Sequence, residues 1–320
     1  MALTLAQAQQ LSQSKLTNFV IDEFRKSALM DMLQFDNTVK AQGGKTLAYV
    51  YNRVTTLPTA ATRAINSEYT PQEAATTQQT VNLKIFGGSF QIDRVLAEDE
   101  EQVVDLVQFE LQQKAQATIA KFHDLFINGD SASDANAFDG LNKALTSSNT
   151  EITPASAIDL SSSTNIDTNW KPFLDILRKL KAKMDSNPNI MLMNRDMYAV
   201  FQSVMDRAGI NLASKENYGD EVSQWGNTTV MALGDRDGSS DPIITTVADG
   251  ATTGETAIYT ARLALDGLHA VSPAGSKLVN TYLPNFKEPG AVKKGEVEMI
   301  SAMVLKATRA AGVLRKIKVA

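Results

Sequence analysis

Hydrophobic residues recur every three to four positions through the segment 98–128, and this spacing predicts one long amphipathic helix. Gln, Lys and Glu occupy the opposite face. The acidic run at 98–101 suits the positive end of a helix dipole, and Asn128-Gly129 supplies a C-terminal stop. A helix of roughly thirty residues is about 45 Å long, so we expect an extended strut. Its apolar positions are Val103, Val107, Leu111, Ala115, Ile119, Phe122 and Phe126.

Residues 43–92 instead alternate between apolar and polar side chains, which is typical of strands. The segment GGKTLAYVYNRV faces the segment TVNLKIFGGSFQID across a stretch rich in Thr and Ala that contains Pro58 and Pro71. This stretch has too few large apolar residues to form a core of its own. Long loops inside compact domains are usually functional or disordered. We therefore predict an extended β-hairpin that projects from the body.

The remaining pattern mixes helices and strands without a regular βαβ repeat or an internal repeat, which predicts the α+β class. Residues 1–35 are predicted to form an amphipathic helical arm, which packs either on the body of its own chain or on a neighbouring subunit. Helices are expected at 170–184 and at 195–206, the latter capped by Asn194, and a buried strand is expected at 190–193. Further strands are expected in WGNTTVMAL, PIITTVA, TAIYTARLALDGLHAV and EVEMISAMVLKATRAAGVLRKIKV.

Composition narrows the function classes. The chain has 320 residues, 43% of them hydrophobic, so it can bury one large core or two moderate ones. We expect a soluble protein made in a cytoplasm, because no apolar run reaches roughly eighteen residues and the N-terminus lacks the features of a secretory signal. With no cysteine and only His123 and His269, we expect neither a metal nor a cofactor. A net charge of −5 argues against a surface devoted to nucleic acid.

Two charged segments have a functional and a simpler interpretation. Asp235–Asp241 is rich in oxygen ligands like a calcium loop, but it lacks the twelve-residue register and terminal Glu, so we favour a polar hairpin turn. A loose basic cluster near the C-terminus is interpreted first as a solvated strand face, with contact to an acidic subunit or packaged nucleic acid as the alternative. Its members are Lys293, Lys294, Arg309, Arg315, Lys316 and Lys318.

The order of these segments resembles the major capsid proteins of tailed bacteriophages with the Hong Kong 97-like fold. Weak motifs in matching order carry the resemblance: Gly129-Asp130 and then Gly140-Leu141 after the long helix, Ile190–Asn194, and Trp225-Gly226. The resemblance implies an N-terminal arm (1–42), an E-loop (43–92), a peripheral P-domain (93–186) with a spine helix (98–128), an axial A-domain (187–280) and a return to the P-domain (281–320).

This resemblance implies a structural protein rather than an enzyme. It would assemble into hexamers and pentamers of an icosahedral shell in the host bacterial cytoplasm and end in the virion. Implied partners are a separate scaffolding protein, a portal protein, weakly bound double-stranded DNA and decoration proteins, with no membrane. An encapsulin-type shell around cargo enzyme is the alternative, and a soluble enzyme of unrelated fold is a remote one. Residues expected at subunit interfaces are Phe19, Phe24, Arg63, Glu68, Tyr69 and Gly140.

Some members of this family join subunits by an isopeptide bond from an E-loop lysine. This chain has no lysine between Val54 and Leu83, and Arg63 is the only cation there. A guanidinium is a poor nucleophile but pairs well with carboxylates. We therefore expect non-covalent contacts and no cross-link. Because the arm begins almost at Met1, we also expect no cleaved scaffold segment ahead of it.

Overall fold

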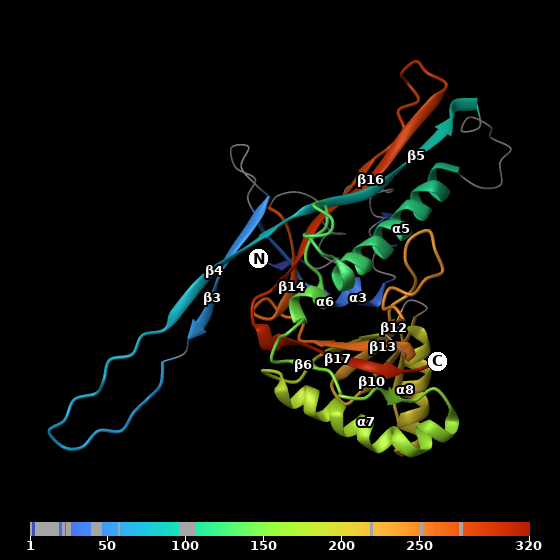
Figure 1. The fold of residues 1–320 in the computed structure, drawn as a ribbon. Helices are drawn as coiled ribbons and strands as arrows, with labels where there is room; N and C mark the ends of the chain where they lie inside the picture. Colours follow the sequence, from blue (N-terminus) through green and yellow to red (C-terminus); the bar gives the residue numbers. More distant parts are fainter. Residues whose placement is uncertain are drawn as a thin grey trace.

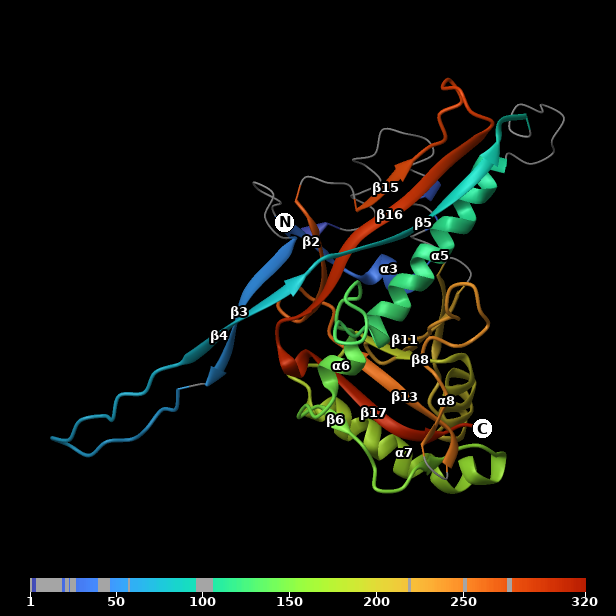
Figure 2. The same cartoon turned by 45° about the horizontal axis from the view of Figure 1, so that its top comes forward.

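The computed structural model describes residues 2–3, 19–20, 23, 27–39, 47–56, 58–95, 106–217, 220–249, 252–274 and 278–320. The described residues form two large sheets and one two-stranded hairpin (Figure 1). One sheet packs against a long helix, the other lies against two further helices, and the hairpin projects away from both (Figure 2). This arrangement agrees with the predicted α+β class.

The first sheet has the strand order β1-β2-β14-β16-β15, with β5 also paired to β16. Helix α5 (Leu106–Asn128) lies along β5 and β16 (Figure 1). It confirms the predicted strut from Leu106 onward, whereas the expected start at 98–105 lies outside the described residues. The strands are β1 (Ala2–Leu3), β2 (Phe35–Val39), β5 (Lys84–Asp93), β14 (Leu268–Pro273), β15 (Val279–Tyr282) and β16 (Val292–Leu305).

A cluster of phenylalanines joins α5 to this sheet. The fully buried ring of Phe122 lies 6.3 Å from Phe35 on β2 and 6.0 Å from Phe86 on β5, measured between ring centroids. It also lies 5.9 Å from Phe126 and 6.1 Å from Phe138. Large aromatic side chains dominate core energetics when they are buried in this way. One residue of α5 therefore connects the arm, the sheet and the turn that follows the helix.

The turn after α5 is held closely against the end of that helix. Gly140 donates its backbone N–H to the carbonyl of Gly129 at 2.8 Å. A Cβ at Gly140 would lie only 2.6 Å from the carbonyl oxygen of Leu125, so a side chain does not fit there. Lys143 pairs with Asp130 at 2.6 Å and Asp139 at 2.8 Å. Helix α6 (Leu141–Leu145) then begins directly after Gly140.

The second sheet has the order β6-β17-β13-β8-β11-β10-β9, with β12 on β13 and β7 on β17. Helices α7 (Ser163–Lys183) and α8 (Arg195–Arg207) pack on it, and their apolar residues form a second core with β8. The strands are β6 (Glu151–Ile152), β7 (Ile158–Asp159), β8 (Ile190–Met193), β9 (Ala213–Asn217), β10 (Asp220–Trp225), β11 (Thr228–Ala232), β12 (Val247–Asp249), β13 (Thr252–Ala261) and β17 (Ala311–Lys318).

Several local predictions in this region are confirmed. β8 is completely buried and has the expected bounds. Asn194 caps α8, because its Oδ1 accepts the N–H of Met197 at 2.8 Å. Helix α7 begins earlier than expected, at Ser163, where Ser162 supplies the cap. The strand expected in PIITTVA is wrong for Pro242–Thr246, where buried Ile243 and Ile244 fill the core without pairing, and only Val247–Asp249 is a strand.

The projecting hairpin consists of β3 (Ala48–Thr56) and β4 (Ala75–Asn82), paired antiparallel (Figure 1). The prediction of a hairpin is confirmed, but the expected pairing of its return strand through Ile92 is wrong. After Leu83 the chain leaves the hairpin, and β5 pairs with β16 from Lys84 to Asp93. The figures show β4 continuing into β5 in nearly the same direction (Figure 2).

The predicted helical arm is only partly helical in the described residues. Helix α3 (Ala28–Met32) is short and capped by Ser27, while β1 and β2 on either side of the arm are strands that pair with each other. Val20, Leu29 and Leu33 are buried in the main core. The described part of the arm therefore packs on the body of its own chain.

Candidate subunit interface

The two histidines are buried structural residues. His123 shares a hydrogen bond of 2.9 Å with the Ser27 hydroxyl, and desolvation lowers its pKa to about 4. His269 is fully buried, and its ring meets Tyr49 edge-on at 5.9 Å between centroids. Neither of its ring nitrogens has a hydrogen-bond partner among the residues that the structure describes. Desolvation, with a contribution from the Lys306 charge, lowers its pKa to about 4. Among the described residues, no group of three or more His, Asp or Glu side chains could hold a metal ion.

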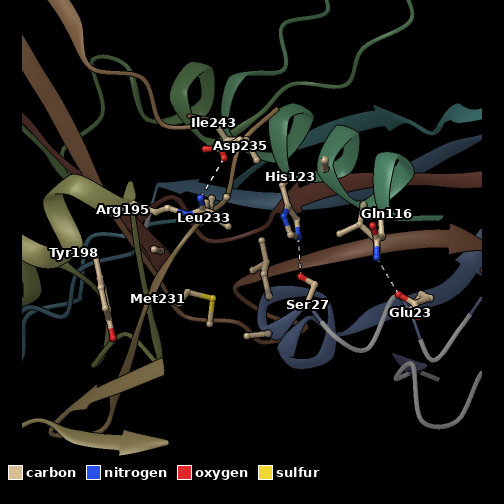
Figure 3. A pocket seen from close by; sticks show the side chains of 16 residues that line it. Glu23, Ser27, Gln116, His123, Arg195, Tyr198, Met231, Leu233, Asp235 and Ile243 are labelled. Carbon is tan, nitrogen blue, oxygen red and sulfur yellow. Dashed lines mark hydrogen bonds and ion pairs between the residues drawn. The ribbon is translucent and has the colours of Figure 1, made fainter. Parts of the chain in front are cut away.

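A groove of about 760 Å³ lies between the arm, α5 and the segment after β11 (Figure 3). On one wall the His123 ring faces Ser27, and the Gln116 amide donates to buried Glu23 at 3.4 Å. On the other wall Arg195 pairs with Asp235 at 3.3 Å. The Ser27–His123 and Gln116–Glu23 hydrogen bonds fasten the arm to α5, whereas the Arg195–Asp235 pair joins α8 to the segment after β11.

The root of the hairpin is fastened to the body by alternate residues of β3. Tyr51 donates its hydroxyl to the carbonyl of Leu305 at 3.1 Å. Arg53 donates from Nε to the carbonyl of Lys306 at 3.1 Å and from Nη2 to Leu305 and to Tyr51. Tyr49 donates to Asp36 at 3.0 Å. We call Tyr51 and Arg53, with these two carbonyls, the root clamp.

The other face of the hairpin is uncovered. Val50 and Val54, which alternate with the clamp residues, are 49% and 53% exposed. At the tip, Ile65 is 92% exposed and Tyr69 is 59% exposed. An isolated two-stranded hairpin is marginally stable in water, and exposed apolar groups on a projecting element favour contact with a partner. The hairpin is therefore the strongest candidate interface in the described part of the chain.

The three tip residues predicted from the sequence lie together. Arg63 donates from Nη1 to the carbonyl of Ser67 at 3.1 Å, and its guanidinium lies 5.5 Å from the centre of the Tyr69 ring. Glu68 is exposed between them in sequence. The turn is closed by the N–H of Ser67 donating to Ala64 at 3.2 Å. Arg63 has no carboxylate partner among the described residues, so its charge is available to a partner.

The other predicted interface residues have different settings. Phe19 is half-buried against the main core of its own chain. Phe24 lies outside the described residues. Gly140 is buried, and the close approach of the α5 backbone explains why a glycine stands there. The contacts shown for Phe19 and Gly140 lie within the subunit, and their interface roles stay predictions.

The charged segments singled out in the sequence are built into the fold. Asp235–Asp241 forms a hairpin turn in which the N–H of Arg236 donates to the carbonyl of Asp241 at 2.9 Å, as the simpler interpretation predicted. The C-terminal basic residues do not form one surface. Lys293, on β16 of the first sheet, is buried and donates to the carbonyls of Glu288 and Pro289. Arg315, on β17 of the second sheet, pairs with Glu151.

Sequence reasoning missed the root clamp. The period-two alternation of Tyr49, Tyr51 and Arg53 was visible and indicated that these side chains share one face. The acceptors of Tyr51 and Arg53 are backbone carbonyls about 250 residues further along the chain. Nothing in the local pattern identifies such distant acceptors.

No protein-family model and no curated protein sequence matches this chain. Solved structures do match it. The SrpI encapsulin of Synechococcus elongatus PCC 7942 is similar with a TM-score of 0.59 at 14% identity, covering 99% of this chain and 97% of that chain. The capsid of a native GTA particle has a TM-score of 0.60 at 10% identity, covering 91% and 90%. A structure of Mycobacterium phage Ogopogo has a TM-score of 0.55 at 14% identity, covering 90% and 91%.

These matches extend over nearly the whole of each chain. They confirm the predicted fold: this chain has the Hong Kong 97-like fold of capsid proteins. At identities of 10–14% the likeness is one of fold. No helix in the described residues is long and apolar enough to cross a membrane.

The root clamp predicts a measurable contribution to subunit stability. Arg53→Ala removes hydrogen bonds to two backbone carbonyls, and we expect the free energy of unfolding of the isolated subunit to fall by about 1–3 kcal/mol. Urea unfolding followed by circular dichroism measures this change. Arg178→Ala is the matched control, because Arg178 is exposed on α7 with one ion pair to Asp175, and we expect a loss below about 1 kcal/mol. Equal losses in the two variants would contradict the clamp.

Because both histidines are buried with lowered pKa values, we expect acid to destabilise the folded subunit. Each binds protons more tightly in the unfolded chain, where its pKa is near 6.5, than in the folded chain, where it is about 4. The contribution of each neutral histidine to the free energy of unfolding is therefore fully present above pH 6.5. It decreases as the pH falls toward 4, and the loss at pH 5 is about 2 kcal/mol per histidine. His269→Gln should reduce the difference in unfolding free energy between pH 7 and pH 5 by about 2 kcal/mol. An unchanged difference would refute the contribution of His269.

Proposed function

We propose that this chain is the major shell subunit of a tailed-bacteriophage head, a structural protein rather than an enzyme. It assembles with copies of itself into hexamers and pentamers that enclose double-stranded DNA. In the terms of the fold, the arm is 1–42, the E-loop 43–92, the P-domain 93–186, the A-domain 187–280 and the return 281–320. The protein is assembled in the host cytoplasm and resides in the virion.

One observation carries this proposal: a projecting hairpin with exposed apolar side chains stands on a fold shared with shell-forming proteins. A shell subunit contacts many copies of itself, so it needs an element that reaches beyond its own body. The hairpin has such reach, because the nine residues of β3 alone span about 30 Å at the usual strand rise. The root clamp fixes the direction in which the hairpin projects from the body.

An encapsulin-type shell around cargo enzyme is the second candidate. The SrpI encapsulin covers the largest share of this chain among the structures compared above, which favours it. The long Thr- and Ala-rich tip of the hairpin favours the phage head, as argued from the sequence. Portal and terminase genes beside this gene would favour the head, and a cargo enzyme gene would favour the encapsulin.

Other partners follow from a phage-head function. A separate scaffolding protein directs assembly, and a portal protein occupies one vertex. Contact with packaged DNA is weak and non-specific, because the net charge is −5 and Lys293, Arg309 and Arg315 of the C-terminal basic cluster are engaged within the chain.

Assembly tests the function directly. We expect the purified, overexpressed chain to form closed shells, or rings of five and six subunits, visible by electron microscopy. Particles from infected or lysogenic cells that contain DNA indicate a phage head, whereas particles that contain a single enzyme indicate an encapsulin. Because the proposal includes a separate scaffolding protein, the chain is also expressed together with its neighbouring genes, and a chain that stays monomeric under both conditions would refute a shell function of either kind.

The lack of a tip lysine predicts shells without covalent links between subunits. Mature particles should give a single band near 34.7 kDa on a denaturing gel, because Arg63 cannot act as the amine of an isopeptide bond. A ladder of linked subunits would contradict this expectation. Arg63→Lys is the informative variant, and a ladder in that variant alone would show that only the amine is missing.

A further inference from the structure

The exposed side of helix α7 carries a concentration of positive charge. Residues 170–184 contain five basic residues and a single acidic one, which gives this segment a net charge of +4. Because the whole chain has a net charge of −5, the remainder carries −9. The helix is therefore a local cationic surface on an acidic protein. Its basic residues are Lys171, Arg178, Lys179, Lys181 and Lys183.

Three of these cations form a row that points away from the second core. Leu177 and Leu180 are fully buried on the side of α7 that packs on the sheet. Lys171, Lys179 and Lys183 are exposed, and positions four or eight apart share one helix face, so the row is about 18 Å long. The helix lies at the outer boundary of the molecule, on the side of the second sheet away from α5 (Figure 1, Figure 2). We call these three lysines the α7 basic row.

The α7 basic row is not neutralised by acidic residues that the structure describes. Lys171, Lys179 and Lys183 make no ion pair with any described residue. Arg178 differs from them, because it pairs with Asp175 at 3.1 Å. Like charges in a row repel one another, and an anion that lies along the row removes this repulsion. The row is therefore a surface to which an extended anion binds favourably.

The stability of the helix accounts for only part of this row. Cations in the last turn are stabilised by the negative end of the helix dipole, and Lys181 and Lys183 occupy that turn. Lys171 lies roughly three turns before the end of α7, and the dipole effect does not extend that far. A cation at this position therefore has no stabilising role in its own helix.

The composition of this surface favours nucleic acid over protein as the partner. Among the described residues, none of the large apolar side chains that are exposed lies on α7 or α8. Protein–protein interfaces have an apolar core and are depleted in lysine, whereas nucleic-acid interfaces are more polar and positively charged. A lysine ammonium is a point charge that binds phosphate without a fixed geometry. Such a surface suits contact with a phosphate backbone irrespective of base sequence.

Both tryptophans of the chain lie beside lysines of α7. The Lys171 ammonium is 5.3 Å from the centre of the Trp170 ring, and the Lys181 ammonium is 3.8 Å from the centre of the Trp225 ring. These are cation–π contacts, which a phosphate that attracts either ammonium weakens. Tryptophan fluorescence therefore reports on anion binding at this helix, because the chain has no tryptophan elsewhere.

We propose that the α7 basic row contacts the phosphate backbone of the enclosed double-stranded DNA. The inference rests on the proposed phage-head function and names the surface that makes its weak, non-specific contact with DNA. It requires α7 to face the interior of the shell. One short row binds weakly by itself, but a shell repeats the row in every subunit, and many weak contacts along one polymer act together.

Removal of charge from the full-length chain tests this surface. The row variant combines Lys171→Gln, Lys179→Gln and Lys183→Gln. The matched control combines Arg94→Gln, Lys287→Gln and Lys294→Gln, which removes the same charge from exposed positions near the ends of β5 and β16. Binding of a labelled duplex of about 20 base pairs to unassembled subunits is measured by fluorescence anisotropy at several salt concentrations. Tryptophan fluorescence is recorded in the same titrations, and circular dichroism checks folding.

We expect the wild type to bind the duplex with a dissociation constant of about 10⁻⁶–10⁻⁴ M, and the row variant to bind at least about ten-fold more weakly. The slope of log affinity against log salt should fall by about 2–3, because each phosphate contact contributes about 0.9. The control should retain most of the affinity. Addition of DNA should change the tryptophan fluorescence of the wild type and the control.

Several results would overturn the assignment of this surface. These are equal losses in the row variant and the control, DNA binding without a change in tryptophan fluorescence, or shells whose cryo-electron microscopy maps place α7 on the outside. Impaired assembly of the row variant with unchanged DNA binding would identify an acidic protein surface as the partner instead. Wild-type shells that contain DNA, together with any of these results, refute the surface alone. A chain that forms no shell, alone or with its neighbouring genes, refutes the proposed function.

Discussion

The packing of Phe122 against four other phenylalanines is the contact on which the rest of the first layer depends. Its ring touches side chains from β2, β5, α5 and the turn before α6, so it joins segments that are far apart in the sequence. A fully buried aromatic side chain in such a position is worth several kcal/mol, because its loss leaves a cavity that the neighbours fill incompletely. This cluster, together with Leu111, Ala115 and Ile119 of α5, packs the helix on the sheet formed by β5 and β16, from which the hairpin projects.

The direction of the hairpin follows from that base. β4 continues into β5 after Leu83, and β5 is held along ten paired positions of β16. The root clamp adds a second attachment, from β3 to the end of β16. A hairpin that is attached through both of its strands keeps a fixed orientation relative to the body. The tip is therefore presented to a neighbour at little cost in conformational entropy, and preorganised contacts of this kind bind more tightly than flexible ones.

Local patterns predicted the elements whose causes are local. The apolar stripe of α5, the Asn194 cap and the buried strand β8 all follow from residues within a few positions of each other. The pairing of β5 with β16 does not, because its partner lies about 200 residues away and the same alternation fits the hairpin equally well. The residues of the candidate interface show the same difference between local and long-range causes. Arg63, Glu68 and Tyr69 could be placed at a tip from the sequence, whereas the root clamp depends on the carbonyls of Leu305 and Lys306, which lie about 250 residues further along the chain.

Solubility before assembly constrains how strong any single contact can be. The exposed apolar side chains of the hairpin are separated by Thr, Gln and Asn, so they form no continuous apolar patch and any one of them supplies only a weak contact. The net charge of −5 adds mutual repulsion between copies, which only local complementarity overcomes. Weak contacts of this kind become stable collectively when a ring closes, because the last contact forms within an already assembled complex.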